Sequence, residues 1–280
     1  MTRIYFAGAD CHWKFLMKHR IKSMMFSYLY HKGWIQKVLE DYKEMFFQLN
    51  KSGVSIFVDS GAHSIQVKGG GKSAKYELEE YMEEYIKFLK KYKDVIKTYV
   101  ELDVEDVIGV EKVNEWYERM LSEGLNPLRV WHPERGLQNW KDETKKFDYI
   151  GIGKFTQLPL PVLKRMMEIA ENNKCKVHGF GCTDPTLIQA LPFYTTDSTS
   201  WLVGEKFGQI PVYSNGKLLF YNKRQVFDKF KKFNDLPYQI IRKFSIYQWK
   251  KFELHVNNRW KEAYFNKITE EDLIGKHKVL

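Results

Sequence analysis

The stretch from residue 149 to residue 181 reads YIGIGKFTQLPLPVLKRMMEIAENNKCKVHGFG and holds a complete strand–helix–strand unit. Its two ends, residues 149–153 and 176–181, are short apolar runs bounded by glycine, which is typical of strands. Between them, residues 161–173 carry apolar side chains at helical spacing. Because strands joined through a helix run parallel, this unit predicts a parallel sheet.

The same alternation continues on both sides of this unit. Residues 11–50 are predicted to hold two helices with a break near Lys32–Gly33, and further helical patterns cover residues 76–92, 110–123 and 140–147. Further strands are predicted at residues 4–9, 55–60, 98–104, 128–132 and 194–199, with an eighth at 210–213. No nucleotide-binding glycine fingerprint is present, so we predict an α/β fold in which residues 1–221 form a closed TIM-type (β/α)8 barrel rather than an open sheet.

Residues 222–280 differ from the rest, because they are helical in pattern, basic and rich in aromatic residues. From Lys223 onward the chain has fourteen Lys and Arg against seven Asp and Glu, and so carries most of the net charge of +10. We predict a basic helical appendage that binds nucleic acid through phosphate contacts. The cations expected to make these contacts are Lys229, Lys231, Lys232, Arg242, Lys243, Lys250 and Lys251. The alternative is an amphipathic helix whose Trp249, Phe252 and Trp260 pack on the barrel.

Three widely spaced cysteines, Cys11, Cys175 and Cys182, indicate a reducing compartment and neither a disulfide framework nor a paired-cysteine zinc site. No apolar stretch approaches the roughly 20 residues that span a bilayer, and the N-terminal apolar run is too short for a signal peptide. We therefore expect a cytoplasmic protein, in the host cytoplasm if phage-encoded, without a membrane partner. The oligomeric state stays open.

Carboxylates follow three of the predicted strands. Asp59 ends VDSG, Asp103 ends ELD and Asp197 lies in TTDS. In a parallel barrel such strand ends meet at one mouth, where three carboxylates repel one another unless a substrate or a metal uses them. Each aspartate could instead cap a helix, and His132 or His178 alone is more often a core residue.

The motifs VDSGAHS, ELDVED, YIGIGKF, VHGFGCTDP and TTDSTSW, in this order, resemble those of the tRNA-guanine transglycosylase superfamily. That resemblance covers roughly residues 55–201 and implies a (β/α)8 barrel that exchanges guanine for a 7-deazaguanine base, with no cofactor. The chain has no cysteine after Cys182 to build the zinc site of the tRNA-directed enzymes. It therefore looks more like the divergent branch, from phages and bacterial modification islands, that places preQ0-like bases in DNA. A tRNA substrate remains the alternative.

The resemblance also implies roles for individual residues. Asp197 matches the nucleophile, Asp59 the acid/base group and Asp103 the carboxylate that reads the guanine edge. Ala62, His63 and Ser64 stand where the family usually has Gly, Phe and Gln, so the base pocket differs there. The remaining residues expected around the base are Ser60, Gly61, His63, Trp131, His132, Gly151, Gly153, Gly179 and Gly181. Phe155 and Phe180 are, like Trp131, candidates to sandwich the ring or to pack in the core.

Independently of any family, two carboxylates placed across a sugar carbon suit glycosyl exchange, since one can attack the carbon while the other moves the proton. Two rival functions are a metal-dependent hydrolase, with His132, His178, Asp59 and Asp197 as ligands, and a non-catalytic nucleic-acid-binding protein. The metal interpretation lacks an HxH or HExxH spacing.

Overall fold

The computed structural model describes residues 2–67, 74–222, 225 and 238–265, with only the backbone at 30–32, 67, 74–76 and 261–265. Within this part of the chain, none of the helices is long and apolar enough to cross a membrane. The cations predicted at Lys229, Lys231 and Lys232 lie outside the described residues.

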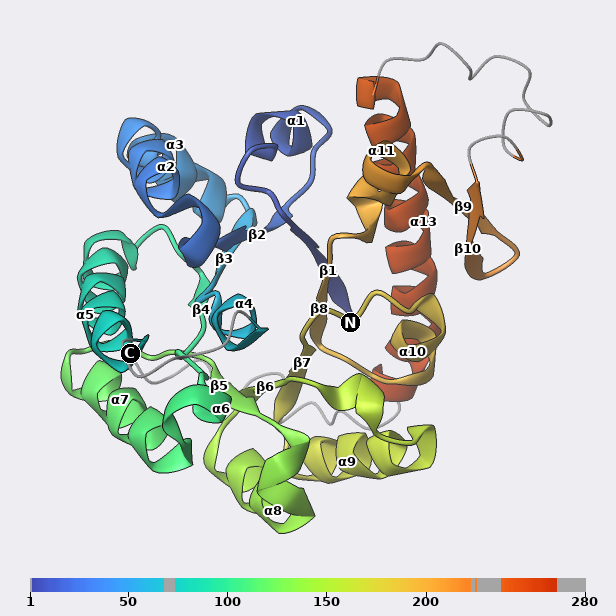
Figure 1. Cartoon of the computed structure of the whole chain (residues 1–280). Coiled ribbons are helices and arrows are strands. Elements are labelled where there is room, and N and C mark those ends of the chain that lie inside the picture. The colour runs from blue at the N-terminus through green and yellow to red at the C-terminus, as the bar shows by residue number, and fades with distance from the viewer. Residues whose placement is uncertain (1, 68–73, 223–224, 226–237, 266–280) are drawn as a thin grey trace.

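Eight parallel strands form one curled sheet with helices around its outer side (Figure 1). Along the sheet their order is β4, β3, β2, β1, β8, β7, β6 and β5. The strands are β1 (Arg3–Ala7), β2 (Ser23–Ser27), β3 (Ser55–Asp59), β4 (Thr98–Tyr99), β5 (Arg129–Trp131), β6 (Tyr149–Ile152), β7 (Lys176–Gly179) and β8 (Thr195–Ser198).

The two edge strands of this sheet approach each other. Val100, next to β4, forms a parallel bridge with Leu128, next to β5. The Glu101 N–H donates to the Leu128 carbonyl at 3.1 Å, and the Leu128 N–H donates to the Tyr99 carbonyl at 2.7 Å. This geometry is compatible with the predicted TIM-type barrel.

The helices follow the strands in the predicted alternation. In chain order they are α1 (Trp13–Lys18), α2 (Tyr28–Asp41), α3 (Lys43–Lys51), α4 (Ala62–Val67), α5 (Ala74–Tyr92), α6 (Glu105–Ile108), α7 (Val110–Ser122), α8 (Gly136–Lys146), α9 (Leu160–Asn172), α10 (Pro185–Ala190), α11 (Val203–Phe207) and α13 (Tyr238–Phe265). Three short 3₁₀ turns are η1 (Pro133–Arg135), η2 (Phe155–Gln157) and η3 (Ser200–Leu202). In α7 the buried residues Val113, Trp116, Tyr117 and Met120 recur every three or four positions, which is the pattern that predicted this helix.

The prediction for residues 11–50 was wrong in three respects, the first of which is that the segment holds three helices, α1, α2 and α3, and not two. The segment SMMFS forms β2, which pairs with both β1 and β3. Moreover, α2 runs through Lys32–Gly33 without a break. Methionine favours helices, and the strand is set instead by burial between two neighbouring strands, which a local pattern does not reveal.

The predicted strand at residues 210–213 belongs to a hairpin and not to the parallel sheet. It lies in β9 (Gln209–Ser214), which pairs antiparallel with β10 (Lys217–Asn222). The connecting Asn215 and Gly216 both have positive φ, 49° and 78°, as a tight two-residue hairpin turn requires. The eighth strand of the sheet is the missed β2.

The predicted separate appendage is not confirmed, because α13 packs in the same core as the barrel helices. Trp249, Phe252 and Val256 are buried there, and Trp260 packs against them. The Ile4 N–H of β1 also donates to Oε1 of Glu253 at 2.7 Å. The alternative, in which the aromatic residues of this helix pack on the barrel, is confirmed.

Side chains alternate between the two faces of the sheet. A small apolar cluster fills the concave side and includes Tyr5, Phe57, Val100 and Val130, whereas the large core under the helices takes the neighbours such as Phe6 and Val58. This alternation decides which residues at the strand ends reach the inside.

Candidate active site

Four polar side chains share the inner face with this small cluster. Asp59 follows Phe57 by two positions in β3, and His132 follows Val130 by two in an extended backbone. From β7, the ring of His178 stacks on Phe57, with centroids 4.7 Å apart. In β8, Asp197 comes two residues after Thr195, whose hydroxyl contacts His178. The strand ends therefore converge as the sequence predicted for Asp59, His132 and Asp197.

Asp197 is almost fully buried, with 7% of its surface exposed. Its Oδ1 accepts a hydrogen bond from the Gly181 N–H at 2.8 Å and lies 3.3 Å from Nε2 of His178. Gly181 has a φ of 58°, which glycine adopts readily. Burial lowers the pKa of His178, so the ring faces Asp197 as a neutral imidazole.

Asp59 has a different electrostatic environment. Burial, together with the charges of Asp103 and Asp197, raises the pKa of Asp59 to about 7, although the hydrogen bond from the Gly61 N–H opposes the rise. That N–H lies 3.2 Å from Oδ2 of Asp59. With a pKa of about 7, Asp59 is partly protonated near neutral pH.

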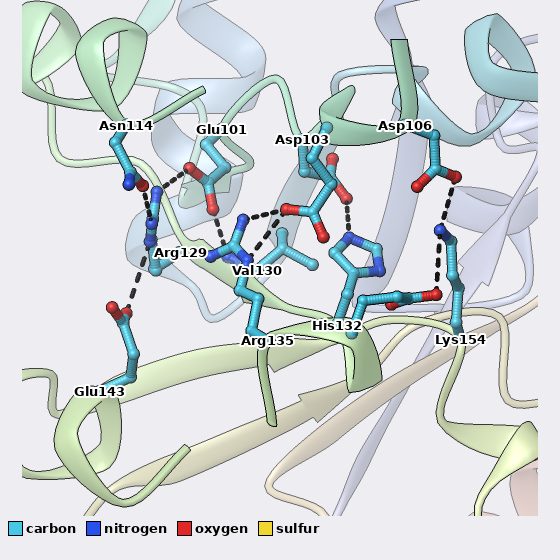
Figure 2. A network of polar contacts seen from close by, with 12 residues as sticks. Glu101, Asp103, Asp106, Asn114, Arg129, Val130, His132, Arg135, Glu143 and Lys154 are labelled. Carbon is cyan, nitrogen blue, oxygen red and sulfur yellow. Dashed lines mark hydrogen bonds and ion pairs between the residues drawn. The ribbon is translucent and has the colours of Figure 1, made fainter. Parts of the chain in front are cut away.

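Asp103 is bound to His132, whose Nε2 lies 2.8 Å from Oδ2 of the carboxylate (Figure 2). Burial lowers the pKa of His132, but the hydrogen bond and charge of Asp103 outweigh it, so the pKa lies above its ordinary value. The Gln66 amide donates to the carbonyl of Asp103 at 2.7 Å. A Cβ on Gly153 would come 2.6 Å from the His132 ring, so glycine is needed there.

Charged residues surround this pair (Figure 2). Arg135 binds Glu105, and Nζ of Lys154 lies 2.6 Å from Asp106 and 3.6 Å from Glu134. Within the described residues, the group that could hold a metal ion is Glu105, His132 and Glu134, with ligand atoms inside 4.8 Å of one another. It shares only His132 with the ligand set of the rival hydrolase, and Arg135 and Lys154 already pair with its two carboxylates.

The segment after Asp59 contributes mostly backbone. Ser60 is buried, and its carbonyl accepts from the Tyr81 hydroxyl at 2.5 Å. Gly61 has a φ of 86°, and a Cβ there would overlap Leu29 at 2.3 Å. His63 is exposed on α4. The first two residues therefore shape the chain beside Asp59, whereas His63 is the one with a free side chain.

The predicted glycines face different surroundings. Phe180 covers Gly151 on the inner side, where a Cβ would come 2.4 Å from its ring. Gly179 faces the opposite side, because the atoms above it belong to Phe193 of the large core. No described atom lies within 4 Å of a Cβ at Gly181. The structure thus brings Gly151, Gly153 and Gly181 to the site and turns Gly179 away from it.

Of the aromatic candidates, only Phe180 lies at the mouth. It is half-buried, and its ring meets His178 edge-on with centroids 4.3 Å apart. Trp131 packs against Trp140 in the large core, with centroids 5.4 Å apart, so its predicted position beside the base is wrong. Phe155 is likewise buried in that core. Trp131 precedes His132 by one residue, so the strand pleat points its side chain to the outer face of the sheet.

The basic residues of α13 are not equivalent. Arg242 binds Glu205 through two nitrogens and lies over the ring of Phe15. Lys243 and Lys251 are exposed, and Lys250 is half-buried. Of the predicted phosphate contacts on this helix, the exposed lysines are therefore the available ones.

Sequence analysis missed a buried charged network on the outer face of β5. Arg129 donates to Glu101 at 2.6 Å, its Nε lies 3.4 Å from Glu143, and it contacts Asn114 (Figure 2). A cavity of about 430 Å³ lies beside it, between α7 and α8 and away from the mouth. A charged residue between the apolar Leu128 and Val130 was the signal that could have revealed this network.

No family model matches the chain, and no curated protein matches it. The resemblance to the transglycosylase superfamily rests on the motifs and on the residues described above.

Proposed function

We propose that this protein is a base-exchanging guanine transglycosylase that replaces guanine in DNA with a 7-deazaguanine base. One observation carries the proposal. Asp59 and Asp197 share the inner face at the carboxyl ends of β3 and β8, and their environments differ. Asp197 faces hydrogen-bond donors, whereas burial raises the pKa of Asp59 to about 7. Two carboxyl groups held in different environments suit one nucleophile and one acid/base group.

In the first half of the reaction, a carboxylate oxygen of Asp197 attacks the anomeric carbon of the nucleotide. The bond from that carbon to guanine breaks, and its electron pair leaves with the base, which takes a proton from Asp59. In the second half, the incoming 7-deazaguanine gives a proton to Asp59 and attacks the same carbon, which releases Asp197. Atoms and charge balance without a cofactor, and the sugar keeps its configuration after two displacements.

A pKa near 7 suits the acid/base role of Asp59 in this cycle. A group that must give a proton and later take one works best when its pKa lies near the working pH. An ordinary aspartate at pKa 3.8 would be almost fully ionised at neutral pH and could not protonate the leaving base.

Asp103 is suited to read the base, because its carboxylate oxygens can accept hydrogen bonds from the donor edge of a guanine-like ring. His132 and Gln66 hold it in place. A buried polar reader discriminates strongly, since a wrong base leaves it unpaired. Phe180 is the aromatic side chain at the mouth against which a base could stack.

The choice of DNA rests on the motif resemblance and the basic C-terminal region. Reaching the site requires the target nucleotide to leave its stack, at a cost of roughly a few kcal/mol when paired. Contacts from cations such as Lys243 and Lys251 to the backbone would offset that cost.

The test is incorporation of labelled guanine into duplex DNA and, separately, into tRNA. We expect label in DNA with the wild type and with Asp94→Asn, which alters an exposed aspartate. We expect none with Asp197→Asn, and a covalent protein–DNA band on denaturing gels that disappears in this variant. Undiminished incorporation by Asp197→Asn would reject the assignment of the nucleophile. Label in tRNA alone would favour the tRNA alternative, and stoichiometric metal by elemental analysis would favour the hydrolase.

A further inference from the structure

A line of polar contacts leads from Asp197 into the interior of the sheet. Nε2 of His178 lies 3.3 Å from Oδ1 of Asp197, and Nδ1 of the same ring lies 2.7 Å from the Thr195 hydroxyl. That hydroxyl lies 2.5 Å from the hydroxyl of Tyr149. Three strands, β6, β7 and β8, therefore contribute one residue each to a line that ends on the proposed nucleophile.

The direction of this line follows from counting protons. A threonine hydroxyl has one hydrogen, so Thr195 cannot donate to both His178 and Tyr149. Burial raises the pKa of Tyr149 well above its ordinary value, so its hydroxyl keeps the proton and can donate it to Thr195. Thr195 is then free to donate to Nδ1 of His178, which leaves the ring hydrogen on Nε2, facing Asp197.

Donation in the opposite direction, from His178 toward Thr195, is unfavourable at the end of the line that meets Asp197. If Nδ1 carried the hydrogen and donated to Thr195, the lone pair of Nε2 would face a carboxylate oxygen at 3.3 Å. Oδ1 of Asp197 accepts a hydrogen bond from the Gly181 N–H, so it acts as an acceptor toward His178 and not as a donor. A doubly protonated ring is disfavoured because His178 is completely buried.

Packing prevents the His178 ring from flipping, which would exchange the positions of its two nitrogens. His178 lies between Phe57, which stacks on it at 4.7 Å, and Phe180, which meets it edge-on at 4.3 Å. The ring of Tyr5 also meets His178 edge-on, with ring centroids 6.4 Å apart. The ring therefore holds its orientation while its two nitrogens keep different partners.

We propose that Tyr149, Thr195 and His178 are positioning residues that act as a one-way hydrogen-bond relay on Asp197. The relay fixes neutral His178 with its Nε2–H on Oδ1, and together with the Gly181 N–H it occupies that oxygen. Oδ2 is then the oxygen that attacks the sugar carbon. This last step rests on the proposed function, whereas the relay itself does not.

The first experiment measures the tautomer of His178 directly, by long-range ¹H–¹⁵N NMR of the protein labelled at histidine nitrogen, with His178→Asn to assign the signals. We expect the hydrogen on Nε2 in the wild type. Thr195→Val keeps the side-chain shape but removes the hydroxyl, so we expect the hydrogen to stay on Nε2 and the ¹⁵N signal of Nδ1 to shift, because that nitrogen loses its hydrogen-bond donor. A wild-type ring with its hydrogen on Nδ1, or with both nitrogens protonated, would overturn the relay.

The second experiment measures single-turnover formation of the covalent intermediate. Loss of an oriented hydrogen bond to a charged group is expected to slow this step about 10- to 100-fold in Thr195→Val. The affinity for the base should stay unchanged, because the relay does not contact it. Thr195→Ser, which restores a hydroxyl, should recover most of the lost rate. A wild-type rate in Thr195→Val would sink the proposal.

Tyr5→Phe supplies the matched control, since it removes another inward tyrosine hydroxyl, one bonded to Ser55 at 2.7 Å and not part of the relay. It should change neither the His178 tautomer nor the rate. If the wild type shows the Nε2–H tautomer but exchanges no base, the proposed function fails and the relay stands. If exchange proceeds while the tautomer is wrong, the relay fails and the function stands.

Discussion

His132 and Asp103 form a buried pair, with Nε2 of the imidazole 2.8 Å from Oδ2 of the carboxylate. They come from the ends of β5 and β4, the two edge strands that approach each other through Val100 and Leu128. Any ligand that contacts Asp103 must therefore meet a carboxylate whose orientation is set by a histidine.

Asp103→Asn should lower the pKa of His132, because the hydrogen bond and charge that hold it above its ordinary value are lost. NMR titration of the histidine ring measures this change directly. The same variant should bind guanine at least about tenfold more weakly by calorimetry, since an amide presents a donor where the base needs an acceptor. An unchanged affinity would remove Asp103 from the base pocket.

Asp59→Asn should stabilise the protein in a pH-dependent way. The folded-state pKa of about 7 lies above the ordinary 3.8, so the wild type loses stability as the pH rises from about 3.8, where Asp59 ionises in the unfolded chain, to about 7, where it ionises in the folded protein. At about 1.4 kcal/mol per tenfold change in proton affinity, the loss is at most about 4 kcal/mol. Urea unfolding should show little gain for the variant at pH 4 and the full gain at pH 8. An equal effect at both pH values would contradict the raised pKa, and Asp94→Asn serves as the exposed control.

Gly153→Ala should displace the ring of His132, which a Cβ would approach to 2.6 Å. We expect a loss of base exchange of about 10- to 100-fold, because the Asp103 pair would shift from its position. Gly33→Ala is the control, since Gly33 lies exposed in α2 with no described atom within 4 Å of its Cβ position. It should leave exchange intact and stabilise the helix by about 1 kcal/mol. Full activity in Gly153→Ala would show that the ring can relax at no cost.

Arg129→Met should destabilise the fold by about 3–5 kcal/mol, because it leaves the buried carboxyl group of Glu101 without its partner. Lys91→Met breaks a pair of equal length, 2.6 Å to Glu40, but with more than half of each side chain exposed. That change should leave the free energy of unfolding almost unchanged, because water screens an exposed pair. Equal losses of unfolding free energy for the two variants would contradict the role of burial.

Trp249→Ala tests whether α13 belongs to the barrel core. Its side chain is 1% exposed, so truncation should cost about 3–5 kcal/mol of unfolding free energy. Leu254→Ala, on the same helix but 61% exposed, should cost about 0.5 kcal/mol or less. A single unfolding transition is expected for both, whereas a separate transition for the C-terminal helix would restore the predicted appendage.

Local patterns were sufficient for the order of strands and helices in most of the chain. The repeated strand–helix units from residue 55 to residue 199 indicated parallel strands, and positions at the strand ends predicted that Asp59, His132 and Asp197 lie at one mouth. These features depend on near neighbours in the sequence, through the helical period and the strand pleat. These local features predicted the position of the proposed catalytic aspartates without any knowledge of contacts between distant segments.

Other features depended on contacts between distant segments. β2 is a strand because β1 and β3 bury it on both sides, and α13 belongs to the core because Trp249 and Phe252 meet residues far away in sequence. The partners of each glycine and the contact between His178 and Asp197 were also beyond a local pattern. β8 reaches β1 by pairing Thr195 with Arg3, across most of the chain. The sequence alone therefore determined which residues could carry the chemistry, and the tertiary structure decided which of them meet, because register and packing are set by segments that no short window contains.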